Sequence, residues 1–493
     1  MTADGRQWTR GDLVRDAARA GAALVAAGGM RRLLTGDIPA AGAARRIPPG
    51  TVHHFVSRPD LRPPALSVLH ADQSLPGYLF LSPSSGPGQR GVLIVDNRGD
   101  VVYFHPTTPN TAMNFRTATY RGKPVLTWWE GKAESGLGRG THVILDHTYR
   151  VVARVPAGHG RQSDLHEFVI TPRNTALITS YEVRSADLRS VGGPSDGRVI
   201  GGIVQELALP SGRVLFEWRS LDHVAIEETH AAFMGHPLDY FHVNSIDLTP
   251  DGNLLVSARN TWAVYKVSRR SGNVIWRLGG KRSDFRMGRG TVFAWQHDAR
   301  HHGTDVVSIF DDGAAPQVEP QSRVLVIKLD VANRRATLER RYTHRPNRLV
   351  TKFMGNAQLL PDGNVFVGWG NEPYLTEFRP DGSIVFDAKL PHGGQNYRAF
   401  RLGWSAQPYT DPVLVAPGGR HGRTAFASWN GATEVTSWRL SAGAARGSLQ
   451  PVLTAHRRGF ETPVEVPAEL RYAAVAALDR HGRVLGRSET IRV

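Results

Sequence analysis

Short runs of apolar residues, separated by turns rich in glycine, proline and aspartate, follow one another along most of this chain. From residue 77 onward they recur as a unit: an apolar run, a turn, a second apolar run, and a third that ends near an aromatic residue. Six such units occupy residues 77–106, 125–155, 164–218, 239–280, 295–342 and 355–390. Short strands punctuated by turn residues are typical of β-sheets rather than helices. The pattern therefore predicts an all-β protein.

Six repeats of this length, each with enough apolar runs for a four-stranded antiparallel sheet, predict a six-bladed β-propeller. The inner strand of each blade lines the central channel, so residues that open the units should meet on the axis. Three successive units open with His166, His242 and His297. Extra segments at about 184–202 and 221–237 are expected to form loops over one face and to shape a substrate entrance.

The character of the sequence changes at both ends of this repeat region, which we place at residues 51–406. Residues 407–493 contain alternating strands and a central tryptophan, which predict a small fibronectin- or immunoglobulin-like β-sandwich without a catalytic cluster. Residues 1–50 are basic and carry a short, weakly apolar run. They predict either an N-terminal arm or a degenerate signal that resembles a twin-arginine export sequence. We expect export, with a cytoplasmic location as the alternative.

Residues 239–260 concentrate candidate chemistry in one predicted hairpin. His242 and Asn244 lie two residues apart, so in a strand their side chains would share a face. The turn at 250–252 then returns the chain and brings Arg259 back to the level of His242. An imidazole, an amide and a guanidinium at one point would suit a tetrahedral anion.

The segment around His297 offers a nucleophile. Neutral imidazole attacks without first losing a proton, and a strand would point His297 and His301 the same way. Any single histidine here is more simply explained as structural or exposed, but three at unit openings favour a site. Either metal ligation or attack on an anion would use such a cluster. We favour the anion, because Glu167 and Asp298 should point away from the histidines and because Arg259 would repel a cation.

Charge and cysteine content narrow the possible partners. The 60 basic and 44 acidic residues give a net charge of +16, but the arginines are scattered singly, so nucleic-acid binding is not predicted while an anionic small substrate is compatible. The absence of cysteine excludes disulfides, thiolate nucleophiles and cysteine-ligated zinc. No segment approaches the ~18 to 20 apolar residues of a membrane span.

Several motifs in these units resemble one known family. They are SRPDLRPP at 57–64, VLTWWEG at 125–131, DLHEF around His166, DYFHVNS with Arg259 downstream, and WQHDA around His297. Over about residues 51–408 the chain resembles the bacterial arylsulfotransferases, in a form similar to an actinobacterial branch. Unlike the best-known members, it has no cysteine, and its predicted sandwich is C-terminal rather than N-terminal.

The resemblance implies a six-bladed propeller that moves a sulfuryl group from an aryl sulfate to a phenol, without a nucleotide or other cofactor and without a metal. It also implies that His297 forms a sulfohistidine, while His166, His242, Asn244 and Arg259 hold the sulfuryl oxygens. The partners would be a small aryl sulfate donor and a phenolic acceptor, and the oligomeric state is not predicted.

Further substrate contacts are expected from Trp129 and Asn356. Trp128, Trp129, Trp295 and Trp369 could all stack on the aryl rings, although most of these tryptophans are expected to pack within the blades. Two alternatives stay open. One is a catalytically silent propeller that binds an anionic glycan or a protein partner. The other is an aryl sulfate hydrolase that uses the same site.

Overall fold

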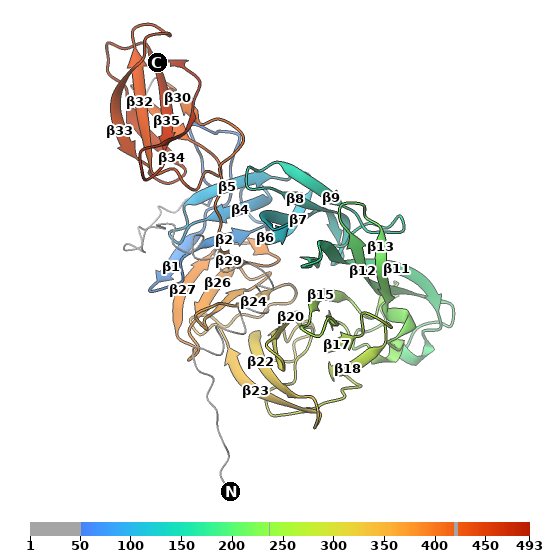
Figure 1. The fold of residues 1–493 in the computed structure, drawn as a ribbon. Helices are drawn as coiled ribbons and strands as arrows, with labels where there is room; N and C mark the ends of the chain where they lie inside the picture. Colours follow the sequence, from blue (N-terminus) through green and yellow to red (C-terminus); the bar gives the residue numbers. More distant parts are fainter. Residues whose placement is uncertain (1–50, 236, 419–422) are drawn as a thin grey trace.

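The computed structural model describes residues 51–235, 237–418 and 423–493 (Figure 1). These residues form 37 strands and three short 3-10 helices, so the all-β prediction is confirmed. The predicted N-terminal arm or export signal at 1–50 lies outside the described residues. Within the part that is described, no helix is long and apolar enough to cross a membrane.

Six sheets of four or five strands follow one another around a ring (Figure 1). The first three, each in its order across the sheet, are β29 (Phe400–Leu402), β2 (Tyr78–Leu81), β4 (Gly91–Val95) and β5 (Val101–Pro106); β6 (Thr111–Tyr120), β7 (Lys123–Glu134), β8 (Leu137–Leu145) and β9 (Val151–Val155); and β10 (Phe168–Ile170), β11 (Thr175–Ala186), β12 (Gly197–Ala208) and β13 (Val214–Arg219), with β14 (Leu238–Asp239) parallel to β12.

The other three sheets are built in the same way. They are β15 (Val243–Leu248), β16 (Leu254–Ala258), β17 (Ala263–Val267) and β18 (Val274–Gly279); β20 (His297–His302), β21 (Val306–Asp311), β22 (Arg323–Asp330), β23 (Arg335–Tyr342) and β19 (Arg286–Met287); and β24 (Asn356–Leu359), β25 (Val365–Gly368), β26 (Tyr374–Phe378), β27 (Ile384–Lys389) and β1 (Ser67–Ala71). A further pair joins β3 (Pro83–Ser85) to β28 (Gln395–Asn396).

The ring closes through strands from both ends of the repeat region, which the unit boundaries did not predict. Strand β29, near residue 400, pairs with β2 to open the first sheet, and β1 pairs with β27 to complete the last. Apolar faces of neighbouring sheets pack together; for example, one core cluster joins Leu255 and Leu278 to Val307 and Leu325. Central strands such as β4 are buried at every position, which explains their continuous apolar runs.

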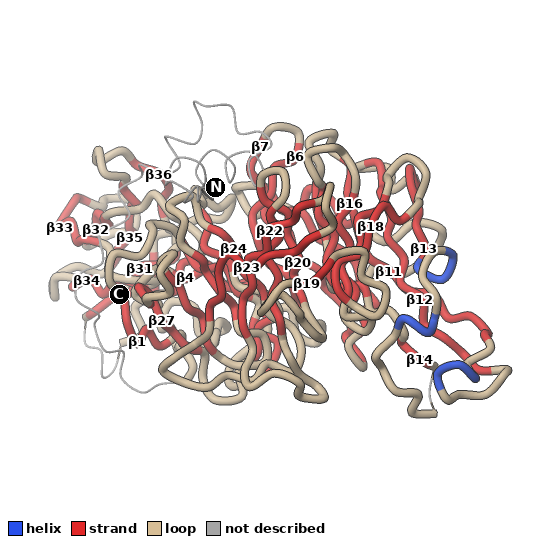
Figure 2. The backbone as a smooth tube through the Cα atoms, turned by 90° about the horizontal axis from the view of Figure 1, so that it is seen from below, coloured by secondary structure: helices blue, strands red, loops and turns tan. Residues whose placement is uncertain are grey.

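The two extra segments are only partly loops. Residues 175–208 form a long hairpin of β11 and β12 with the 3-10 helix η1 (Arg189–Val191) at its turn, so the expectation of a loop across 184–202 was largely wrong. The second segment carries η2 (Ser220–Asp222) and η3 (Ile226–Glu228). Figure 2 shows these short helices together near β12, β13 and β14.

The C-terminal residues form two further sheets that share one apolar core beside the ring (Figure 1). One contains β30 (Val413–Val415), β31 (Thr424–Ser428) and β34 (Glu461–Glu465), and the other β33 (Gln450–His456), β32 (Ser437–Gly443), β35 (Tyr472–Leu478), β36 (Val484–Arg487) and β37 (Ile491–Arg492). Hydrogen bonds attach this region to the ring: the amide of Phe104 donates to Asn430 at 3.0 Å, and the hydroxyl of Ser57 donates to Glu461 at 2.7 Å.

Candidate active site

Three histidines lie where the first strands of three consecutive sheets begin. His166 lies two residues before β10, His242 directly precedes β15, and His297 is the first residue of β20. All three are buried, with exposed fractions of 3%, 8% and 2% respectively. The rings of His166 and His242 meet edge to face with centroids 4.9 Å apart. The structure thus brings together the histidines that the unit openings singled out.

Each of these imidazoles is anchored by its own aspartate, a feature that the sequence analysis missed. The Nδ1 to Oδ2 distances are 2.5 Å for His166 and Asp164, 2.5 Å for His242 and Asp239, and 2.7 Å for His297 and Asp312. A carboxylate accepts a hydrogen bond from Nδ1–H and leaves Nε2 free to contact a substrate. The motifs DLH and DYFH place the aspartates of His166 and His242 two and three residues before them, so these two pairs could have been found in the sequence. Asp312 instead follows β21, a different strand from that of His297.

Tyr397 joins the histidine cluster from a distant part of the chain. Its ring centroid lies 5.6 Å from that of His166 and 6.5 Å from that of His297. Its hydroxyl donates at 3.3 Å to the backbone carbonyls of His166 and Asn244. Tyr397 therefore connects two of the sheets that supply the site, and no motif in the sequence pointed to it.

The predicted hairpin at 239–260 is present with the expected pairing of Arg259 and His242, but His242 itself is not part of the strand. The amide of Arg259 donates to the carbonyl of His242 at 3.0 Å, so both residues lie at the same level. However, His242 lies outside β15 with a φ of 54°, so the strand alternation that predicted a shared face with Asn244 does not apply. Asn244 donates to the carbonyl of Gln296 at 2.6 Å, and its Oδ1 is buried without a partner.

Arg259 is held by packing and by hydrogen bonds to Oδ1 of Asn260 and to one backbone carbonyl. Its guanidinium lies over the ring of Trp295, 4.8 Å from the centroid, and one terminal nitrogen donates to the carbonyl of Lys352 at 3.0 Å. Its Nε is buried without a partner. Trp295 is thus occupied in supporting Arg259, and an unpartnered N–H is left for an anion.

The protonation of His297 follows from its neighbours. The backbone N–H of Met354 points at Nε2 from 3.4 Å, and because an N–H only donates, Nε2 carries the lone pair. Nδ1 then holds the proton and donates a hydrogen bond to Asp312. Burial lowers the pKa of His297 well below its ordinary value, and the positive charge of Arg259 lowers it further. His297 is therefore a neutral imidazole with its lone pair on Nε2.

His301 does not join His297, contrary to the prediction. A β-bulge between His297 and Arg300 inserts one extra residue, at Asp298, where φ is 52°. The insertion shifts the alternation of the strand, so His301 lies on the opposite face. Its Nε2 contacts the carbonyl of Thr304 at 3.1 Å.

Trp129 and Asn356, which we expected to bind substrate, are engaged in structural contacts. Trp129 is completely buried and donates from Nε1 to the carbonyl of Ser163 at 3.0 Å. Asn356 spans the backbone of Ala399, donating to its carbonyl at 2.8 Å and accepting from its amide at 2.9 Å. Trp128 and Trp369 lie in the cores between sheets. The amide groups of Asn356 are thus used within the fold.

A buried ionic network lies next to the histidines. Glu167 is fully buried and contacts Arg116 at 3.2 Å, Arg300 at 2.5 Å and Arg398 at 3.1 Å. Burial alone would raise the pKa of Glu167, but the three guanidiniums outweigh it and hold that pKa well below the usual range. Asp298 also pairs with Arg300, at 2.6 Å. The carboxylates next to His166 and His297 in sequence therefore face arginines.

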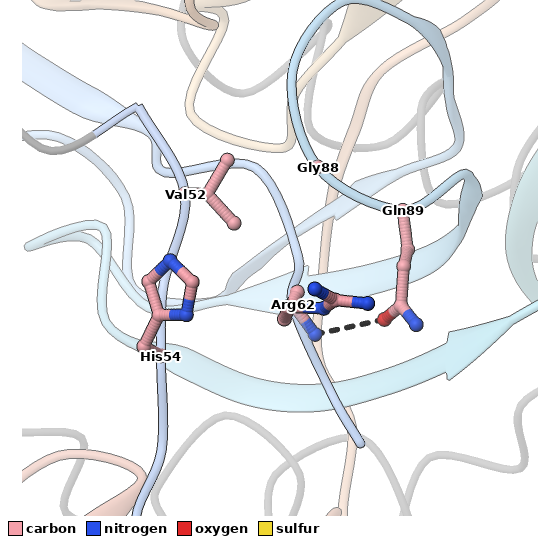
Figure 3. A pocket seen from close by; sticks show the side chains of 5 residues that line it. All are labelled: Val52, His54, Arg62, Gly88 and Gln89. Atoms are coloured by element: carbon pink, nitrogen blue, oxygen red, sulfur yellow. Dashed lines mark hydrogen bonds between the residues drawn. The ribbon is translucent and has the colours of Figure 1, made fainter. Parts of the chain in front are cut away.

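No group of three or more metal-ligating side chains suited to a metal ion is found among the described residues. A cavity of about 320 Å³ is lined by Val52, His54, Arg62, Gly88 and Gln89 (Figure 3). There the amide of Arg62 donates to Gln89 at 2.8 Å. None of the three clustered histidines lines this cavity, so it is separate from the candidate site.

Comparison with known proteins gives a family match. Residues 116–390, more than half of the chain, match the model of a family described as arylsulfotransferase (ASST), and this span contains the three histidines and Arg259. No curated protein matches.

Similar solved structures include a protein of unknown function from Bacteroides caccae, with 13% identity over 66% of this chain and 98% of that chain and a TM-score of 0.41. Virginiamycin B lyase from Staphylococcus aureus has 9% identity over 74% of this chain and 96% of its own, with a TM-score of 0.34. A putative 6-phosphogluconolactonase from Bacteroides fragilis has 11% identity, coverage of 79% and 98%, and a TM-score of 0.35. At these scores the similarity assigns no activity to this chain.

Proposed function

Because this chain belongs to the arylsulfotransferase (ASST) family, we propose that it transfers a sulfuryl group from an aryl sulfate ester to a phenolic acceptor through a sulfohistidine at His297. The observation that carries this proposal is the state of His297. It is a buried imidazole with Nδ1 anchored by Asp312 and a lone pair on Nε2, in the electrostatic range of Arg259. A module that only binds an anion would need no neutral nucleophile beside the guanidinium.

In the first half of the reaction, Nε2 of His297 attacks sulfur and the bond from sulfur to the aryl oxygen breaks. Negative charge develops on the sulfuryl and departing oxygens, and the unpartnered Nε–H of Arg259 stabilises it by donating a hydrogen bond. The departing phenolate takes a proton from Nε2 of His242, whose Nδ1 is held by Asp239. Burial lowers the pKa of the adjoining His166, so that ring is neutral and does not act as the acid. Asp312 accepts the hydrogen bond from Nδ1 throughout and stabilises the charge that forms on the imidazole.

In the second half, the acceptor phenol returns a proton to Nε2 of His242, and its oxygen attacks sulfur. The bond between Nε2 and sulfur then breaks, so that free His297 is regenerated. Donor phenol leaves before the acceptor reacts, which predicts ping-pong kinetics. Asn244, with an unpartnered Oδ1, lies beside the histidines in a position to orient a protonated group of the substrate.

We interpret the six sheets of the ring as six propeller blades and the C-terminal pair of sheets as an accessory β-sandwich. The strand counts and the ring arrangement support the first interpretation, and the shared core of the two C-terminal sheets supports the second. Export remains a proposal that rests on the sequence of residues 1–50.

Incubation with 4-nitrophenyl sulfate, with and without a phenol, tests this function. Release of 4-nitrophenol and a covalent gain of one sulfuryl group on a peptide containing His297, absent in His297→Ala, are the expected results. His301→Ala is the matched control on the same strand and should keep activity, because its ring lies on the opposite face. No turnover and no adduct with several aryl sulfates would refute the proposal. Sustained turnover without a phenol would identify water as the acceptor.

A further inference from the structure

The hairpin of β7 and β8 ends against the candidate site. Its tip consists of Ser135 and Gly136, with φ values of 49° and 81°, as in a tight two-residue turn. A Cβ added to Gly136 would lie 3.1 Å from Cε1 and 3.8 Å from Nε2 of His242. This is the edge of the imidazole that remains available, because Asp239 occupies Nδ1. A side chain at the tip would therefore press on this edge of the imidazole.

The arms of this hairpin are fixed rather than free to swing. Gly131, Gly138 and Gly140 surround the indole of Trp129, and a Cβ on any of them would come within 2.8 Å of that ring. Trp129 is itself tied to Ser163. These glycines are needed for close packing, so the part of the hairpin around Trp129 is held in place.

One hydrogen bond also links the hairpin directly to the site. The amide of Gly138 donates to Oδ1 of Asp164 at 2.7 Å, while Oδ2 of the same carboxylate holds Nδ1 of His166 at 2.5 Å. A Cβ on Gly138 would also come within 2.6 Å of the amide of Leu165. The hairpin is thus anchored beside His166, and its tip lies at His242.

We propose that this tip is a fixed wall that determines substrate specificity, with Gly136 as the deciding residue. The wall selects phenols and aryl sulfates that carry no bulky substituent ortho to the reacting oxygen. The inference rests on the proposed function, in which Nε2 of His242 contacts that oxygen. Ortho substituents lie within two bonds of the ring carbon bearing the oxygen, so they meet the tip. Para substituents point away from it.

The chain contains a matched control for this position. The hairpin of β6 and β7 has the same kind of turn at the other end of β7, with φ values of 50° at Arg121 and 73° at Gly122. A Cβ on Gly122 would meet nothing within 4 Å. Alanine or valine at Gly122 would therefore carry the same backbone strain as at Gly136, without approaching the histidines.

The test compares transfer from 4-nitrophenyl sulfate to 4-methylphenol and to 2,6-dimethylphenol. In Gly136→Ala, the ratio of kcat/KM for the para to the ortho acceptor should rise at least about tenfold, the low end of what one methyl group is worth in substrate discrimination. Gly122→Ala should leave the ratio unchanged. An equal ratio in Gly136→Ala and Gly122→Ala would overturn the inference while leaving the transferase function intact.

If the wild-type protein transfers no sulfuryl group, the proposed function fails. The effect of the tip is then tested through the chemical accessibility of the His242 imidazole. Diethyl pyrocarbonate modifies accessible imidazole nitrogens, and peptide mass spectrometry measures its rate at His242. Gly136→Val should slow this modification severalfold relative to Gly122→Val, because the added side chain covers the Nε2 edge. Equal rates in the two variants would overturn the inference.

Discussion

His142 should make the stability of this protein fall steeply in mild acid. It lies on β8, opposite Trp129 in the register with β7, and is completely buried with its ring stacked on Phe168 at 4.4 Å. Both ring nitrogens are buried without a hydrogen-bond partner. The perturbation that tests its role is His142→Leu, which keeps an apolar side chain of similar size and removes the titrating group.

The magnitude follows from the difference in proton affinity between the two states. Burial lowers the pKa of His142 to about 3 in the folded protein, against 6.5 for an ordinary histidine. Between these values the unfolded chain binds more protons, so stability falls as the pH is lowered through this window. From about pH 7 to about pH 5 this single group should cost about 2 kcal/mol, at about 1.4 kcal/mol per pH unit below 6.5.

Urea unfolding followed by tryptophan fluorescence, at about pH 7 and about pH 5, measures this loss. The wild-type protein should lose about 2 kcal/mol more between the two pH values than His142→Leu does. His147→Gln, a change at an exposed histidine of the turn after β8, serves as the control and should behave as the wild type. If His142→Leu loses as much stability on acidification as the wild type, the neutral buried state assigned to His142 is wrong.

Three further predictions concern the site. Asp312→Asn should slow formation of the sulfohistidine by about 10³-fold or more, because an amide that donates to Nδ1 would move the proton of His297 to Nε2. Intact mass in single-turnover experiments measures the rate of sulfohistidine formation. The same rate should stay flat as the pH falls through about 6.5, because burial and Arg259 hold the pKa of His297 well below that value, and an acid limb centred near 6.5 would contradict this. Glu167→Gln should cost about 3 to 5 kcal/mol in urea unfolding, since it leaves buried guanidiniums without their partner, whereas little change would show that the network is not needed for stability.

The sequence pattern predicts the sheets well because each strand carries its own local signal. Apolar alternation and turn residues mark β15 and β16, and the turn at 250–252 sets their register, so the position of Arg259 relative to His242 could be predicted. The family match is consistent with the motifs around His166 and His297. These features depend on contacts within one hairpin or on short segments, which is the range over which a sequence pattern is informative.

Side-chain directions at the starts of the inner strands could not be predicted in the same way. Strands β6, β15 and β20 each contain a bulge near the start, and Asn114 and Asp298 adopt positive φ there. Each bulge inserts one residue and reverses the alternation beyond it. The prediction that His301 faces the site failed for this reason. The aspartate partner of His297 was missed because it comes from the end of the next strand.

Tyr397 follows the same pattern as the three histidines, but it precedes a strand that the predicted units did not include. The histidines that open three successive units lie together, yet the strand that opens the first sheet is β29, which comes from the far end of the repeat region. Tyr397 and Arg398 lie three and two residues before β29, much as His166 lies two residues before β10. Arg398 donates to the carbonyl of Asn244 at 2.8 Å and pairs with Glu167. The segment that closes the ring therefore also holds the strands that carry His166 and His242 in place. The site is therefore complete only when the two ends of the repeat region have paired.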